Sequence, residues 1–112
     1  YNSAHVMGTT GGTTEDMKES LVLSEQGRIN PAVMVTPIGG LDSAAQTILE
    51  LPKLSGGKKL IYNPISMPLT ALKDFRAMSG KDPRFAALAD IVDSSNGLWC
   101  PEAEKYLLSH WR

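Results

Sequence analysis

The sequence is poor in the residues that hold small proteins together covalently or through metals. It has one cysteine, Cys100, and two histidines, His5 and His110, among 112 residues. A disulfide framework needs paired cysteines, and a structural zinc site needs about four Cys or His ligands. These counts exclude a disulfide framework and a cysteine-based zinc site.

Excess charge and long apolar runs are also lacking. Eleven Lys and Arg residues stand against twelve Asp and Glu residues, which excludes a strongly basic nucleic-acid binder and an acidic disordered tail. No apolar run approaches the ~20 residues that span a bilayer, and there is no signal-peptide pattern. We therefore expect a cytoplasmic protein without nucleic-acid or membrane partners. Because the chain begins with Tyr1 rather than Met, a trimmed chain, a processed product and a fragment all stay open.

An alternation of strands and helices is the main pattern that the sequence does show. Gly and Pro residues divide the chain, and apolar β-branched runs alternate with stretches of helical periodicity. The predicted strands are 3–7, 32–36 and 58–62, and the predicted helices are about 14–26, 42–51, 70–79, 83–94 and 101–111. The order β-α-β-α-β-α-α-α predicts an α/β fold with a small sheet. Three strands are few for such a domain, so further strands are expected upstream.

Local signals set several of these boundaries. Thr13 and Asp16 have the spacing of a capping box, and Gly27 is a natural helix terminator. Pro37 is expected to end the second strand, which is apolar enough to be covered on both faces. Asp42 is expected to cap the helix that follows.

No complete active site emerges from the residue pattern. The Gly-rich segment 8–14 opens a helix, where backbone N–H groups can meet a phosphate, but it matches neither a dinucleotide fingerprint nor a P-loop. A flexible strand–helix turn is the simpler interpretation. We interpret Cys100 as a small hydrophobe. Trp99 and Trp111 are interpreted as anchors of the last helix, unless they prove exposed and mark a partner surface.

Three blocks of sequence nevertheless resemble the zinc-type, medium-chain alcohol dehydrogenases. In that family, the last strand of the nucleotide-binding domain ends in a Gly-small-residue pair and passes to a helix that begins with acids. An isoleucine–proline element, a short strand and a helix follow, and then a glycine–lysine strand. The matching residues here are His5-Val6-Met7-Gly8-Thr9 with Glu15-Asp16, then Ile29-Asn30-Pro31, Val33-Met34-Val35-Thr36 and Leu41-Asp42-Ser43-Ala44-Ala45, then Gly56-Gly57-Lys58-Lys59-Leu60-Ile61. The longer tail, 64–112, is similar to that of the subgroup containing L-sorbose 1-phosphate reductase and related polyol dehydrogenases.

The resemblance implies that the chain is the C-terminal part of an enzyme with a GroES-like and a Rossmann-type domain. Residues 1–8 would be the last strand of the nucleotide-binding domain, 9–63 the return to the catalytic domain, and 64–112 a helical C-terminal extension. The family's Gly-x-Gly-x-x-Gly turn and zinc ligands lie upstream of this region. The chain is therefore expected to be inactive without the missing N-terminal part.

The resemblance also assigns the site residues expected in this chain. The backbone of His5, Val6, Met7, Gly8 and Thr9 would lie beside the nicotinamide carboxamide of NAD or NADP. The whole enzyme, a homo-oligomer, would transfer a hydride between this cofactor and an alcohol, polyol or sugar phosphate, with an upstream zinc as Lewis acid. No catalytic and no metal-ligating residue is expected within the chain itself.

Two other functions stay open at the level of sequence. A small non-catalytic α/β module would bind a protein partner, using the unpaired edges of a three-stranded sheet. A phosphate-ligand binder would use the 8–14 loop together with Lys58 and Lys59.

Overall fold

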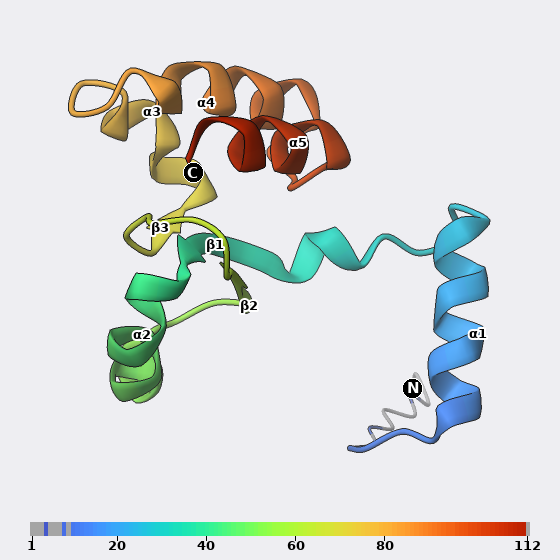
Figure 1. Cartoon of the computed structure of the whole chain (residues 1–112). Coiled ribbons are helices and arrows are strands. Elements are labelled where there is room, and N and C mark those ends of the chain that lie inside the picture. Colours follow the sequence, from blue (N-terminus) through green and yellow to red (C-terminus); the bar gives the residue numbers. More distant parts are fainter. Residues whose placement is uncertain (1–3, 5–7, 9, 112) are drawn as a thin grey trace. The chain divides into compact units, whose positions relative to one another are not determined.

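The computed structural model describes residues 4, 8 and 10–111, which divide into two units (Figure 1). The first unit is Tyr1–Asn30 and the second is Pro31–Arg112. The strand predicted over 3–7 lies outside the described residues, apart from Ala4. Among the described residues, no helix combines the length and the apolar character that crossing a membrane requires.

The first unit contains one described helix, α1 (Thr14–Glu25), whose two ends confirm the predicted signals. The Thr13 amide donates to Asp16 Oδ2 at 2.6 Å, and the Asp16 amide donates to Thr13 Oγ1 at 3.3 Å, which completes the capping box. At the other end, Gly27 has φ +68°, and the Arg28 amide donates to the Leu23 carbonyl at 2.9 Å. This is the Schellman arrangement, in which the glycine takes a conformation that side chains disfavour.

The second unit is built on a mixed three-stranded sheet. The strands are β1 (Val35–Gly40), β2 (Lys58–Tyr62) and β3 (Thr70–Ala71), in the order β2-β1-β3. The central strand β1 runs parallel to β2 and antiparallel to β3. The α/β class and the strand over 58–62 are confirmed.

Two predictions about the central strand were wrong. Residues 31–34 form a 3₁₀ turn rather than a strand, and β1 runs through Pro37 and the two glycines that were expected to end it. Pro37 is tolerated because it lies where the register between β1 and β2 shifts, between Val35 and Ile38. A proline, which has no N–H to donate, is accepted in a sheet at such an irregularity.

Gly40 of β1 is required by a close crossing of the chain. A Cβ atom on Gly40 would meet the Ile65 carbonyl oxygen and would lie 2.6 Å from the Met67 nitrogen. The Gly40 amide donates to the Met67 carbonyl at 2.8 Å across the same contact. The 65–67 segment therefore packs directly on the backbone of β1, where a side chain has no room.

The first helix of the tail is shorter than predicted. The helix expected over 70–79 begins only at α3 (Phe75–Met78), because Thr70 and Ala71 are extended and pair with Ile38 and Pro37 as β3. The next two helices, α4 (Arg84–Ser94) and α5 (Pro101–His110), confirm the prediction to within one or two residues. The remaining helix, α2 (Ala44–Glu50), lies between β1 and β2 in the chain.

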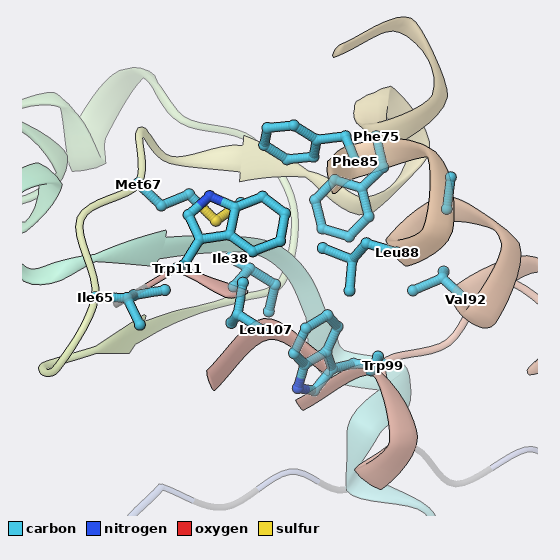
Figure 2. Close-up of a cluster of buried hydrophobic side chains, with 12 residues drawn as sticks. Ile38, Ile65, Met67, Phe75, Phe85, Leu88, Val92, Trp99, Leu107 and Trp111 are labelled. Carbon is cyan, nitrogen blue, oxygen red and sulfur yellow. The ribbon is translucent and has the colours of Figure 1, made fainter. Parts of the chain in front are cut away.

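Helices α3, α4 and α5 cover one side of the sheet, and α2 lies on the other (Figure 1). The core lies on the side of α3–α5, and Figure 2 shows its side chains. Its largest fully buried side chains are Phe75, Ile38, Met67, Leu88 and Leu107. Trp99 and Trp111 are buried, and the Trp111 ring centroid lies 5.1 Å from that of Phe85. The prediction that both tryptophans anchor the last helix is confirmed.

We expect the Leu88→Ala variant to lose about 3 kcal/mol of unfolding free energy, because it removes buried contacts and leaves a cavity. Leu88 has no exposed surface, whereas Leu49 on α2 is 75% exposed. Leu49→Ala is therefore the matched control, with an expected change within about 0.5 kcal/mol. Urea unfolding followed by circular dichroism measures both, and equal losses would contradict this placement of the core.

Candidate functional site

A polar network in the second unit joins β2 to α5 and to the segment before α5. The Tyr62 hydroxyl donates to Glu104 Oε2 at 2.5 Å and accepts from the Trp99 indole nitrogen at 2.9 Å. Burial raises the pKa of Tyr62 above its ordinary value, and the bond to the Glu104 carboxylate raises the pKa further. A tyrosine that holds its proton this firmly is a tether between elements rather than a general base.

Ion pairs occupy the two arginines of the tail that the structure describes. Arg76 reaches from α3 to α4, where it donates to Asp90 at 2.8 Å and to Asp93 at 2.5 Å. Arg84 pairs with Asp82 at 2.6 Å and lies over the Trp111 ring, 4.3 Å from its centroid. The hydrogen bonds from Arg84 lower the pKa of Asp82. Both guanidinium groups already pair with carboxylates of the chain and are therefore poor candidates for binding a substrate.

Asp42 does not cap a helix, as the sequence predicted, but holds the crossing segment in place. Its carboxylate accepts from the Ser66 hydroxyl at 2.6 Å and from the Met67 amide at 3.0 Å. These two bonds, the first above all, lower the pKa of Asp42. Asp42 lies too early to cap α2, because residues 41–43 form a 3₁₀ turn and α2 begins only at Ala44. The carboxylate is thus free to bind donors that are distant in sequence.

A cavity beside the sheet has a volume of about 490 Å³. Its lining combines apolar side chains and main chain with two hydroxyls and one cation, and the residues are Val33, Val35, Thr36, Ser55, Gly56, Ala71, Leu72, Lys73, Gly97 and Leu98. No carboxylate, histidine or thiol lines it. The cavity therefore has no carboxylate–histidine or thiol arrangement that would activate its hydroxyls.

A second concavity, which we call the α2–β2 groove, lies between α2 and the outer strand of the sheet. It has a volume of about 390 Å³ and is lined by Ala44, Thr47, Ile48, Leu51, Gly57, Lys58, Lys59 and Ile61. Along β2, Leu60 and Tyr62 pack on the core, so Lys59 and Ile61 face the opposite side of the sheet. The lining is mainly apolar, yet Ile48 is 66% exposed and Leu51 is 48% exposed.

Most of the predicted cofactor-binding residues lie outside the described part of the chain. This holds for His5, Val6, Met7 and Thr9, and their assignment stays a prediction. Gly8 is described and exposed, and a Cβ atom built on it would meet nothing within 4 Å. A larger side chain therefore fits at Gly8 without disturbing the described residues.

The polar candidates for phosphate binding are engaged in local contacts. Thr13 and Asp16 bond each other, and the Asp16 carboxylate occupies the helix N-terminus where an anion would lie. The Lys59 ammonium donates to the carbonyls of Gly56 and Gly57, at 3.1 and 2.8 Å. Both arrangements disfavour the phosphate-binder hypothesis.

No metal site fits the described residues. Among residues 4, 8 and 10–111, no three His, Cys, Asp or Glu side chains come together as ligands. His110 stacks on Tyr106, with ring centroids 4.0 Å apart, and Cys100 is a half-buried free thiol just before α5. A zinc ion therefore has no ligand set in this part of the chain.

Known proteins match nearly the whole chain. It is 53% identical to an uncharacterized protein, YggP, of Escherichia coli K12, and 49% identical to mannitol-1-phosphate 5-dehydrogenase of Aliivibrio fischeri, in each case over 99% of this chain and 26% of the relative. It is 42% identical to L-sorbose 1-phosphate reductase of Klebsiella pneumoniae, over 98% of this chain and 25% of that protein. No family model and no solved structure matches.

The chain thus spans about a quarter of the length of the curated relatives that it matches. It matches the C-terminal part of mannitol-1-phosphate 5-dehydrogenase and of L-sorbose 1-phosphate reductase. The predicted resemblance to the end of a polyol dehydrogenase is confirmed.

We expect Tyr62→Phe to lose about 1 kcal/mol of unfolding free energy at neutral pH, because two hydrogen bonds are removed. The folded pKa of Tyr62 lies above its unfolded value. Its stabilising effect is therefore complete below pH 10 and is lost as the pH rises through the folded pKa. Absorbance titration at alkaline pH should show one of the three tyrosines ionising late. The late phase should vanish in Tyr62→Phe and persist in Tyr106→Phe, and the reverse result would contradict the assignment.

Proposed function

We propose that the chain is the C-terminal part of an oxidoreductase that transfers a hydride between NAD or NADP and a polyol phosphate or sugar phosphate. The observation that carries the proposal is the identity of 49% and 42% to two enzymes named for such substrates, over almost the whole chain. The alternative of a stand-alone interaction module is not favoured, because the relatives with named activities are enzymes. The same match supports the expectation that the chain is inactive alone.

We propose a structural role for each of three segments, in the order of the chain. Residues 1–8 are the last strand of a Rossmann-type nucleotide-binding domain, 9–63 return to a GroES-like catalytic domain, and 64–112 form the helical extension. The 490 Å³ cavity and the α2–β2 groove support this division, since neither lining contains a carboxylate, a histidine or a thiol. The chemistry then belongs to the part of the enzyme that precedes this chain.

The cofactor contribution that we assign to this chain is a short stretch of backbone. Main-chain N–H and C=O groups of residues 5–9 would bind the nicotinamide carboxamide and so help to position the cofactor. When bound, the cofactor would supply the hydride-transfer chemistry, and the base that takes the hydroxyl proton of the substrate would lie outside this chain. The open space around Gly8 supports the proposal, because a cofactor needs unobstructed access to the backbone there.

The proposal also includes a zinc ion and homo-oligomeric assembly, both as properties of the whole enzyme. The described residues offer no zinc ligand set, so any catalytic zinc is held upstream, and no step in this chain depends on it. A medium-chain, zinc-type enzyme remains our proposal on the strength of the sequence blocks over residues 4–63.

A chimera tests the proposed function directly. The C-terminal quarter of the Aliivibrio fischeri mannitol-1-phosphate 5-dehydrogenase is replaced by this chain, which is 49% identical to that part. We expect the chimera to reduce NAD with mannitol 1-phosphate, and we expect the isolated chain to show no turnover. A truncated enzyme that lacks its C-terminal quarter is the negative control. A folded chimera as inactive as the truncated enzyme would contradict the proposal.

The same chimera tests the role of the backbone at residues 5–9. We expect Gly8→Val to raise the KM for the nicotinamide cofactor by about tenfold, equal to the loss of ~1.4 kcal/mol of cofactor binding. Its thermal unfolding should not change, because a side chain at Gly8 meets nothing in the described structure. Gly80→Val is the control, since Gly80 is also open and lies far along the chain, between α3 and α4. Equal KM values in the two variants would refute the assignment.

A further inference from the structure

We infer that the 490 Å³ cavity beside the sheet, which we call the Lys73 cavity, binds the phosphate group of the substrate. The inference rests on the proposed function, because it takes a sugar phosphate or polyol phosphate as the ligand. It goes further by assigning recognition of the phosphate to Lys73, Thr36 and Ser55. Phosphate recognition is thereby separated from hydride transfer, which we assign to the part of the enzyme that precedes this chain.

The lining of the Lys73 cavity has the composition of a small-molecule site. Ligand pockets commonly measure roughly 300–1,000 Å³ and combine apolar walls with a few polar groups. Here the polar side chains are those of Thr36, Ser55 and Lys73, set among apolar side chains and main chain. The lining contains a positive charge and no Asp or Glu. An anion with several oxygen atoms fits this set, because an ammonium group and hydroxyls can all donate hydrogen bonds to it.

The three polar groups are available to a ligand. All three residues are exposed. Among the described residues, no carboxylate pairs with the Lys73 ammonium, and the hydroxyls of Thr36 and Ser55 have no hydrogen-bond partner. Asp74, which follows Lys73 in the chain, does not line the cavity. Gly56 leaves the Thr36 hydroxyl uncovered, since a Cβ atom on Gly56 would lie 3.3 Å from Thr36 Oγ1.

Several other cations of the second unit are less suited to bind a phosphate. The two described arginines of the tail pair with carboxylates, and the Lys59 ammonium donates to main-chain carbonyls. Lys105 lines a concavity on α5 together with Glu104, whose carboxylate repels an anion. The Lys73 cavity differs because a cation and two hydroxyls share a lining without a carboxylate.

Segments that are distant in sequence build the Lys73 cavity. Thr36 belongs to β1, Ser55 precedes β2, and Lys73 follows β3. The helical extension therefore supplies the cation, and the preceding segment supplies the hydroxyls. The name of the Aliivibrio fischeri relative places the phosphate at carbon 1 of its substrate and the dehydrogenation at carbon 5. The two ends of such a substrate can be recognised by different parts of an enzyme, so a phosphate site needs no acid–base group of its own.

The chimera of this chain with the Aliivibrio fischeri enzyme tests the inference through its kinetics. We expect Lys73→Gln to raise the KM for mannitol 1-phosphate about tenfold and to leave the KM for NAD unchanged, because the phosphate alone loses a partner. Lys73→Arg should keep the KM within about threefold of the original, since a guanidinium group also donates to phosphate. Lys81→Gln is the matched control, because it removes the same charge from an exposed residue outside the cavity.

Inorganic phosphate provides a readout that does not depend on turnover. In the isolated chain, the NMR signals of the Gly56 and Gly97 amides are followed while phosphate is added at constant ionic strength. Both residues line the cavity, and we expect both signals to shift and to saturate at millimolar phosphate. The shift should be lost in Lys73→Gln and retained in Lys81→Gln. Thermal unfolding of both variants should stay within about 2 °C of the original, because both side chains are exposed.

Three results would overturn the inference. An active chimera in which Lys73→Gln leaves the KM for mannitol 1-phosphate unchanged would show that the phosphate binds elsewhere. Amide signals that phosphate does not shift would show that the cavity is no phosphate site. Equal losses in Lys73→Gln and Lys81→Gln would reduce the effect to net charge. An inactive chimera, in contrast, refutes the proposed function, and the amide signals then decide the phosphate site by themselves.

Discussion

The close crossing of residues 65–67 over Gly40 is the constraint on which the second unit depends. No Cβ atom fits at Gly40, and the Gly40 amide and the Asp42 carboxylate both bond the Met67 backbone. The crossing delivers the chain to β3 and buries Ile65 and Met67 in the core. The crossing needs a glycine at position 40, because any side chain there would collide with the backbone of Ile65 and Met67. Asp42 reinforces the contact with an anion whose pKa its donors keep low, so the bonds persist at neutral pH.

One face of the sheet is covered by α3–α5, and the opposite face, beside α2, is only partly covered. On the side of α3–α5, aromatic rings interlock, with Phe75 5.6 Å from Phe85 and 6.4 Å from Trp99 between ring centroids. Tyr62 closes this side by bonding Trp99 and Glu104. On the side of α2, exposed apolar side chains line a groove instead. Such asymmetry is unfavourable for an isolated domain, because exposed apolar surface costs free energy in water, and it is natural for a part that packs against more of its own polypeptide.

Sequence reasoning succeeded where structure is decided locally. The capping box of Thr13 and Asp16, the glycine after α1 and the strand over 58–62 each depend on a few neighbouring residues. It failed where contacts between segments that are distant in sequence determine the local structure. The sequence predicts that Pro37 and the following glycines end the strand, but the 65–67 segment and β3 pack on β1 there and extend it. The sequence also predicts a helix at Thr70 and Ala71, but these residues pair with Ile38 and Pro37 as β3. The groove was missed for the same reason, since periodicity shows that Ile48 and Leu49 share a face but not which of them is left without a cover.

The polar side chains of the second unit indicate what such a part contributes to an enzyme. Arg76, Arg84, Asp42 and Tyr62 all spend their hydrogen-bonding capacity on holding elements together. Catalytic groups, in contrast, need unspent capacity directed into a cavity. In the second unit these four side chains therefore serve the fold. The buried core behind β1 and β2 fixes the positions of these elements within the second unit.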